Sequence, residues 1–263
     1  MARFCSLFSS SSGNCIYVGQ PEGGILIDVG VSAKRTAETL DCIGVDIRSV
    51  GAIFVTHEHS DHVAGIKVLA GRHNIPVYSS AGTLDAMAQN GILTGKFPAE
   101  EISMLGMEVC GMHVRPFHTP HDSRESLGFT VETADGNRVA IATDIGTVND
   151  EVLKNIACSQ LVLLESNHDI RMLQNNPNYP YILKRRILSD KGHLSNEMCA
   201  KTAATLVESG TTRLFLGHLS KENNLPELAY QTTAALLSTK GMQEGSDYIL
   251  RVAGVGNPKM TVF

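Results

Sequence analysis

One short run constrains this chain more than any other part, the six residues His57-Glu58-His59-Ser60-Asp61-His62 that follow an apolar segment. Alternate residues of an extended segment point to the same side, so His57 and His59 can present their imidazoles to one ion. Asp61 and His62 stand where a helix is predicted to begin, from which they can reach a second ion. Four side chains of this kind in six residues indicate a metal site rather than a solvated loop with chance histidines.

The composition favours a folded chain with a sizeable core. Of the 263 residues, 43% are hydrophobic and only 19% are charged, which argues against disorder. No sequence repeat or low-complexity linker divides the chain. We therefore predict one domain over residues 1–263.

Short apolar runs bounded by glycine or proline alternate with stretches of helical spacing. Strands are predicted at Cys15–Val18, Ile25–Val29, Ala52–Thr56, Val77–Ser79, Glu108–Pro116, Gly128–Thr133, Arg138–Thr143, Leu161–Glu165, Leu214–Gly217 and Tyr248–Val252. Helices are predicted at Ala33–Leu40, Asp61–Arg72, Thr83–Asn90, Asp150–Cys158, Ser195–Glu208 and Pro226–Thr239. The segment Gly128–Asp144 reads as a hairpin that turns at Asp135-Gly136-Asn137. Strands in runs, mixed with helices in both halves, predict an α/β chain with two sheets face to face and helices outside.

Nothing in the sequence predicts a membrane protein or a secreted one. The longest apolar stretches fall well short of the roughly 18 residues that span a bilayer. The first residues, MARFCSLFSSSSGN, lack the long apolar core of a secretory signal. Six scattered cysteines without a C-x-x-C pair fit buried thiols in a reducing compartment. We expect a cytoplasmic protein.

The run T-H-x-H-x-D-H at positions 56–62 resembles the signature of the metallo-β-lactamase superfamily, and further motifs follow in that family's order. Asp28 in Leu26–Gly30 matches the residue that orients the histidine ligands. His121 in Pro-His-Asp-Ser, Asp144 in Ala-Thr-Asp and His218 in Leu-Gly-His-Leu-Ser match the remaining ligands. The resemblance implies a metallo-β-lactamase fold, which is a four-layer αββα sandwich.

On this mapping two divalent ions share one aspartate. The resemblance gives one ion His57, His59, His121 and Asp144, and the other Asp61, His62, Asp144 and His218. Histidine and carboxylate ligands suit Zn²⁺, Mn²⁺ or Fe²⁺. His118 competes with His121 for the place of the third histidine ligand of the first ion, and we prefer His121 because the Pro-His-Asp-Ser phrase aligns with family members.

Spacing narrows the branch of the superfamily. The 22 residues between His121 and Asp144 leave no room for the long arm of many tRNA-processing members. The 73 residues between Asp144 and His218 are too few for a large inserted domain, so we expect none.

Several phrases resemble the small bacterial WalJ/YycJ-like group over nearly the whole chain. They are Ser10-Ser11-Ser12-Gly13-Asn14-Cys15, Glu165-Ser166-Asn167-His168-Asp169, Tyr179-Pro180 with Leu183-Lys184-Arg186-Ile187, and Gly192-His193-Leu194-Ser195-Asn196. The resemblance implies a phosphodiesterase, namely a nuclease related to 5′ to 3′ exonucleases of double-stranded DNA. Nucleic acid, with DNA favoured, is then the partner.

Phosphodiester chemistry also needs an acid. Two close ions can share a hydroxide nucleophile, and the leaving alkoxide then takes a proton. We assign His193 as that acid and Glu165 as the group that orients it, and Asp61 is counted with the catalytic residues. The alternative for His193 is that it caps the helix predicted from Ser195.

Two polar segments stay open between a structural and a binding role. The net charge is −5, and Lys184, Arg185, Arg186 and Lys191 form the one notable basic cluster. It is either a solvated helix face or a contact to the phosphate backbone. The loop Ser9–Asn14 is either a phosphate cradle or a tight turn.

Two other functions compete with the nuclease. The same hydroxide could attack the carbonyl of a small ester, thioester or lactone, which predicts a narrow apolar pocket and no use for His193. A non-catalytic metal protein is the third possibility, and the complete ligand set argues against it.

Overall fold

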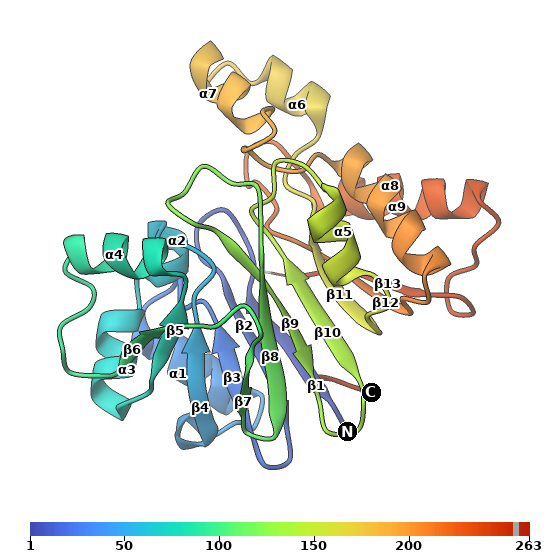
Figure 1. Ribbon diagram of the computed structural model, residues 1–263. Coiled ribbons are helices and arrows are strands. Elements are labelled where there is room, and N and C mark those ends of the chain that lie inside the picture. Colours follow the sequence, from blue (N-terminus) through green and yellow to red (C-terminus); the bar gives the residue numbers. More distant parts are fainter. Residues whose placement is uncertain (255–257) are drawn as a thin grey trace. The chain divides into compact units, whose positions relative to one another are not determined.

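The computed structural model of the chain describes residues 1–254 and 258–263 (Figure 1). The chain divides into two compact units. Unit 1 consists of Met1–Pro116, Ser123–Asn137 and Gly254–Phe263, and unit 2 of Phe117–Asp122 and Arg138–Ala253. Both units mix strands with helices, as predicted for an α/β chain.

Unit 1 contains a seven-stranded sheet in the order β14-β1-β2-β3-β4-β5-β6. Its strands are β1 (Arg3–Phe8), β2 (Cys15–Gln20), β3 (Gly23–Ile27), β4 (Val50–Phe54), β5 (Val77–Ser79), β6 (Ala99–Glu101) and β14 (Thr261–Val262). Pairing is antiparallel from β14 to β3 and parallel from β3 to β6. The parallel part forms where helices connect the strands: α1 (Ala33–Cys42), a 3₁₀ turn at Ile47–Ser49, α2 (Ser60–Val63), α3 (Ile66–His73) and α4 (Ala81–Gln89).

Apolar side chains from strands and helices form the core of unit 1. Leu26 and Ile53 of the sheet share one buried cluster with Leu40 of α1 and Leu69 of α3. Two of the helices begin at side-chain caps: Ser32 accepts the backbone N–H of Arg35 at α1, and Ser80 accepts that of Thr83 at α4. Packing of this kind fixes β4, whose end carries the metal motif.

A further set of strands in unit 1 is β7 (Met107–Val109), β8 (Met112–His118) and β9 (Leu127–Glu132). The Phe54 ring of β4 meets the Phe129 ring of β9 edge to face at 5.6 Å, so the two layers share apolar contacts. β7 and β8 replace the single strand predicted at Glu108–Pro116. The chain turns between them because Cys110 and Gly111 both have positive φ, at 52° and 70°, as a two-residue hairpin turn requires.

Unit 2 contains four parallel strands, β10 (Arg138–Ala142), β11 (Leu161–Glu165), β12 (Arg213–Gly217) and β13 (Ile249–Val252). The helices are α5 (Asp150–Ile156), α6 (Ile170–Asn175), α7 (Tyr181–Ile187), α8 (Asn196–Glu208) and α9 (Pro226–Thr239). Leu164 and Leu216 of the strands pack with Cys199 and Ala203 of α8 in one buried cluster. Figure 1 shows α6 and α7 away from these strands, at the far end of the unit.

The structure corrects several predicted elements. The strand predicted at Ile25–Val29 ends at Ile27, and the helix predicted at Asp61–Arg72 is broken into α2 and α3 around Gly65. Strand β1 and helices α6 and α7 were not predicted. Cys5, Cys15 and Cys199 are buried as expected, whereas Cys42 and Cys158 are exposed.

A helix that crosses a membrane must be long and apolar. Within residues 1–254 and 258–263, none of the helices is both long and apolar enough to cross a bilayer.

Candidate metal centre

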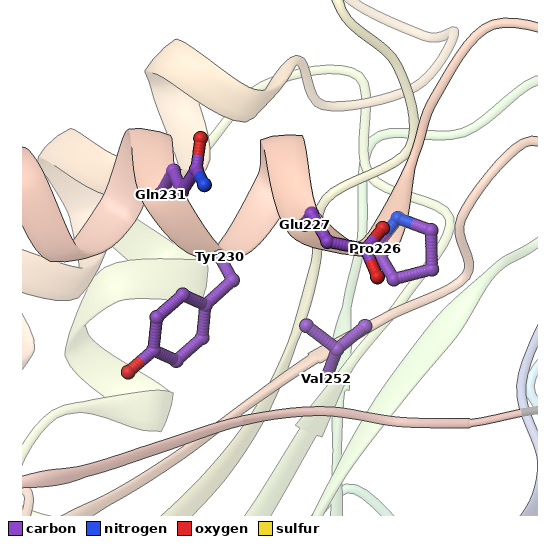
Figure 2. Close-up of a pocket in the computed structure, with 5 residues that line it drawn as sticks. All are labelled: Pro226, Glu227, Tyr230, Gln231 and Val252. Atoms are coloured by element: carbon purple, nitrogen blue, oxygen red, sulfur yellow. The ribbon is translucent and has the colours of Figure 1, made fainter.

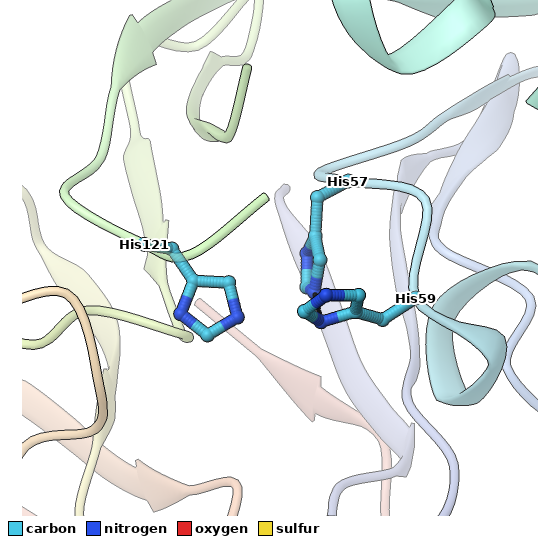
Figure 3. A group of neighbouring side chains, drawn as sticks. All are labelled: His57, His59 and His121. Atoms are coloured by element: carbon cyan, nitrogen blue, oxygen red, sulfur yellow. Dashed lines mark hydrogen bonds between the residues drawn. The ribbon is translucent and has the colours of Figure 1, made fainter. Parts of the chain in front are cut away.

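The predicted histidine run lies in unit 1 between the end of β4 and the beginning of α2. His57 and His62 are buried, and His59 occupies the N-cap position of α2. The Nε2 atom of His57 lies 3.0 Å from the Nδ1 atom of His59, and their rings meet at 81° (Figure 3). The Asp61 carboxylate lies 3.4 Å from the His62 Nε2 atom. The four side chains of the motif therefore lie together, as their spacing predicted.

Asp28 holds the loop that carries these histidines in place. Its buried carboxylate accepts hydrogen bonds from the backbone N–H and the hydroxyl of Thr56, both at 2.8 Å. The same carboxylate lies 2.7 Å from the Nδ1 atom of His62. An imidazole whose Nδ1 is held by a carboxylate presents Nε2 as its metal-binding nitrogen. The structure thus places Asp28 against a ring nitrogen of a predicted ligand, where it can orient that histidine.

The segment after Asp28 leaves no room for side chains. A Cβ atom on Gly30 would lie 1.6 Å from the backbone oxygen of Asp61, so only glycine fits there. Asn14 donates its backbone N–H to that oxygen at 2.8 Å, and its side-chain amide lies 3.0 Å from the His62 Nε2 atom. Ser10 also donates its backbone N–H to the Asn14 side chain. These contacts favour the tight-turn interpretation of the loop Ser9–Asn14.

Unit 2 gathers its polar side chains at the carboxyl ends of parallel strands. Asp144 follows β10, Glu165 is the last residue of β11, and His218 follows β12. Because the three strands are adjacent and parallel, these ends share one edge of the sheet. The Asp144 Oδ1 atom lies 3.5 Å from the Nε2 atom of His218 and 3.8 Å from that of His121. Asp144 thus faces two of the predicted ligands.

Glu165 is the centre of this cluster. Its Oε1 atom lies 2.8 Å from the Nδ1 atoms of both His193 and His218. Its other oxygen accepts the backbone N–H groups of Ile145 and Leu194. Burial opposes its ionisation, but the two neighbouring imidazoles and their hydrogen bonds hold its pKa below the usual value. Glu165 therefore stays a carboxylate that accepts from both rings.

The His193 ring is half-buried beside these groups. Burial alone would lower its pKa, but the Glu165 carboxylate and its hydrogen bond raise it above the ordinary value. The helix after it begins at Asn196, and the hydroxyl of the preceding Ser195 accepts the backbone N–H of Met198. Ser195 is thus the cap of α8, and the geometry does not support the capping role considered for His193.

His121 and His118, the two candidates for the third histidine ligand, differ in their surroundings. His121 is buried, its Nδ1 atom lies 3.2 Å from the backbone oxygen of Gly192, and burial lowers its pKa. His118 is exposed and lies 3.5 Å from the Glu151 carboxylate of α5. A neutral, buried imidazole beside Asp144 suits a metal ligand, so the geometry of unit 2 favours His121.

The donor chemistry of each unit fits a divalent metal. Unit 1 offers the imidazoles of His57, His59 and His62 with the carboxylate of Asp61. In unit 2 the possible ligand atoms of Asp144, Glu165, His193 and His218 all lie within 4.8 Å of one another. Imidazole and carboxylate groups suit zinc, manganese and iron.

A hollow on unit 2 lies apart from this chemistry. It is lined by Pro226, Glu227, Tyr230, Gln231 and Val252, on α9 and β13 (Figure 2). The Tyr230 hydroxyl is bonded to Glu244 at 2.5 Å, and this contact raises the pKa of the phenol. Because none of the predicted ligands lines the hollow, it does not supply the narrow apolar pocket that a carbonyl hydrolase would need at the metals.

Sequence reasoning missed several residues that hold the site. Thr56 was read only as part of the motif string, yet its hydroxyl joins the Asp28 network. Asp122 pairs with Arg186 of α7 beside His121. A polar residue directly flanking each ligand was the available signal. The partner of each such residue depends on the fold and could not be read from the sequence.

Comparisons with known proteins identify the family to which these motifs belong. A family model described as "Beta-lactamase superfamily domain" matches residues 24–219. Exodeoxyribonuclease YycJ of Bacillus anthracis is 36% identical over 250 residues, which cover 94% of this chain and 93% of that protein. Exodeoxyribonuclease WalJ of Streptococcus pneumoniae serotype 2 is 34% identical, with 94% and 92% covered. Both relatives confirm the predicted similarity to the WalJ/YycJ-like group.

A solved structure confirms the fold class. The metallo-beta-lactamase fold protein YhfI from Bacillus subtilis matches with a TM-score of 0.71 at 14% identity, and 99% of each chain is covered. At this identity the likeness concerns the fold alone. It agrees with the predicted αββα sandwich and, for the described residues, with the expectation of no large inserted domain.

Proposed function

Because the chain belongs to the beta-lactamase superfamily, we propose that it is a metal-dependent exodeoxyribonuclease in which His193 protonates the leaving oxygen. Two relatives that share most of its length are named exodeoxyribonucleases, so the chain is a hydrolase of phosphodiester bonds. The observation that carries the finer proposal is the contact of His193 with Glu165 at 2.8 Å, beside Asp144.

We assign the ligands as the motifs order them. His57, His59, His121 and Asp144 are to bind one ion, and Asp61, His62, Asp144 and His218 the other. Two close divalent ions, when bound, supply an activated water and neutralise charge on the phosphoryl oxygens. Zn²⁺ and Mn²⁺ both suit these donors, and the metal is part of the proposal. Asp28 and Glu165 support it, since each holds the Nδ1 atom of a proposed ligand.

His193 has the properties of a proton donor. Glu165 accepts from Nδ1, which leaves Nε2 as the nitrogen that gives a proton to the leaving alkoxide. The raised pKa keeps the ring protonated nearer to neutral pH. The side chain is 19% exposed, so a substrate can reach it. Glu165, with a lowered pKa, then stabilises the imidazolium without taking its proton.

The remaining parts of the proposal concern substrate and setting. DNA is the proposed substrate because both relatives are named for it. We further propose that both units form one domain and that the protein works in the cytoplasm. The buried thiols of Cys5, Cys15 and Cys199 support a reducing compartment.

The test compares two leaving groups. His193→Ala should slow cleavage of end-labelled duplex DNA by about 10²- to 10⁴-fold, because a positioned acid contributes that much. Hydrolysis of bis-(p-nitrophenyl) phosphate should fall much less, because p-nitrophenolate leaves without a proton. Metal content, measured by mass spectrometry, should stay at the wild-type level.

The control is His113→Ala, which removes a half-buried histidine bonded to Glu108 and Leu105. It should leave both activities unchanged. Equal loss of both activities in His193→Ala, together with lost metal, would show that His193 is a ligand and would end its assignment as the acid.

A further inference from the structure

Helix α7 of unit 2 differs from the other α-helices described above in that none of its residues is fully buried. Two of its large apolar side chains face solvent, with Tyr181 73% and Ile182 81% exposed, whereas Leu183 and Ile187 are half-buried. Leu188, directly after the helix, is 43% exposed. Short helices are usually stabilised by an apolar face packed on the protein, and contiguous exposed apolar groups mark binding surfaces.

Polar contacts also hold α7 in place. The Lys184 ammonium donates to the backbone oxygen of Gln174 in α6 at 2.7 Å. Arg186 pairs with the Asp122 carboxylate, next to His121, and this pair raises the pKa of the guanidinium. Two of the four cations in the basic cluster are therefore used within unit 2.

The other two cations face solvent. Arg185 lies over the Tyr181 ring, with its guanidinium carbon 5.9 Å from the ring centroid. Lys191 is exposed. Among the described residues neither Arg185 nor Lys191 forms a salt bridge. The Arg185 guanidinium thus stands over an aromatic ring, and Lys191 lies two residues before His193, next in sequence to the exposed Asp190.

This surface is joined tightly to the proposed acid. The His193 backbone N–H donates to the oxygen of Ile187, the last residue of α7, at 2.9 Å. A Cβ atom on Gly192 would lie 2.2 Å from that same oxygen, so the turn between α7 and His193 is too tightly packed for a side chain at this position. The position of α7 is therefore fixed with respect to His193.

We propose that Tyr181, Arg185 and Lys191 form a platform that holds the end of a DNA strand next to His193. This inference rests on the proposed function and identifies how its substrate is held. Aromatic rings stack on bases of any sequence, and exposed cations contact phosphates. The charge of the surface complements DNA, and its connection to His193 places the bound strand beside the acid.

The experiment measures DNA affinity with the metal-loaded full chain. Tyr181→Ala should weaken binding of a fluorescent duplex with a short single-stranded tail by about 5- to 100-fold, the range for one stacked base. Arg185→Gln and Lys191→Gln should each lower the slope of log affinity against log salt by about 1. Hydrolysis of bis-(p-nitrophenyl) phosphate should change much less, because that substrate has no neighbouring base or second phosphate for these side chains to hold.

Matched controls come from unit 1. Leu105→Ala removes an apolar side chain that is 83% exposed, and Lys34→Gln removes a cation that is equally exposed. Both should bind DNA as the wild type does. Circular dichroism of each variant verifies that the helices are retained.

Two results would overturn the platform. One is wild-type DNA affinity in Tyr181→Ala while the wild-type enzyme degrades DNA, which leaves the proposed function standing. The other is a dimer in sedimentation that Tyr181→Ala and Ile182→Ala dissociate without change in DNA binding, which would make α7 an interface between copies. A wild-type enzyme that cleaves neither DNA nor the small phosphodiester would instead defeat the proposed function.

Discussion

The histidine cluster of unit 1 and that of unit 2 are assembled in different ways. In unit 1 the side chains come from six consecutive residues at one strand end. In unit 2 they come from the ends of β10, β11 and β12 and from two loops, over positions 121 to 218. The first cluster is brought together by local chain geometry and then held by Asp28, whereas the second exists only once parallel strands are aligned. Contiguous ligands can therefore be recognised from their spacing alone, whereas the dispersed ones were predicted only through the family resemblance.

The two clusters nevertheless share a device. A buried carboxylate holds a histidine Nδ1 atom in each: Asp28 holds His62 in unit 1, and Glu165 holds His218 in unit 2. Asp28, Asp144 and His218 also adopt positive φ values, between 56° and 61°, which are uncommon for residues other than glycine. Strain at these strand ends fits residues kept for function and not for stability.

The largest expected effect comes from removing a ligand in either unit. His57→Ala and His218→Ala should each lower the metal content below two ions per chain. DNA cleavage should fall by more than about 100-fold, since even outer partners of metal ligands can cost that much. Metal analysis and end-labelled DNA digestion measure the two quantities. If either variant kept full metal content and activity, that unit would have no part in the centre.

The next effect separates the two carboxylates. Asp28→Asn and Glu165→Gln keep the side-chain size but weaken the hold on His62 and His218, so metal affinity should fall by about 10- to 100-fold in each. Glu165→Gln should slow DNA cleavage more than hydrolysis of bis-(p-nitrophenyl) phosphate, because it also disturbs His193. Asp28→Asn should slow both equally. Kinetics at saturating metal measure this difference, and the same ratio in both variants would contradict the assignment of Glu165.

Some elements of the fold were predicted from the sequence with the correct bounds, whereas others were missed. The strands Val77–Ser79 and Leu161–Glu165 and the helix Pro226–Thr239 have the predicted bounds, because their apolar patterns match their periods. The strand β1 was missed because its serine reads as polar, although Ser6 is buried. The assignment of the seven ligands and the single-domain organisation remain predictions.

Helix α7 is an element that the sequence pattern did not predict. It has no fully buried residue, and its two half-buried apolar residues, Leu183 and Ile187, are too few to mark a helical period in the sequence. The basic cluster was visible in the sequence, but only the structure separates the paired Lys184 and Arg186 from the solvent-facing Arg185. Pairing across a fold cannot be read from spacing.

Unit 2 also holds a histidine without the support that His62 has. His168 is 1% exposed, and neither ring nitrogen has a hydrogen-bond partner among the described residues. Burial lowers its pKa to about 4. The unfolded ring takes up a proton near its ordinary pKa of 6.5, so the stability of the neutral ring is complete above that pH and is lost as pH falls toward 4.

The expected loss between pH 7.5 and pH 5 is about 2 kcal/mol of unfolding free energy. His168→Leu removes this titration and should show a correspondingly smaller loss, with little change at pH 7.5 because no hydrogen bond is broken. Urea denaturation at the two pH values measures the difference. Equal pH dependence in the variant and the wild type would mean that the acid sensitivity of unit 2 lies elsewhere.

The smallest expected effect tests whether the segment around His193 is structural or chemical. Ser195→Ala removes the hydroxyl that accepts the Met198 backbone N–H, so α8 should lose about 1 kcal/mol of unfolding free energy. DNA cleavage at full saturation should stay at the wild-type rate, because the Glu165 contact with His193 is untouched. The matched control is Asn149→Ala at the cap of α5, where the Asn149 side chain accepts from Val152 at 2.9 Å and a similar loss is expected. Urea melts and DNA digestion of the same preparations measure both quantities. If Ser195→Ala slowed DNA cleavage as strongly as His193→Ala, the loop would act through its conformation, and the contrast between a chemical cluster in unit 2 and its structural cap would fail.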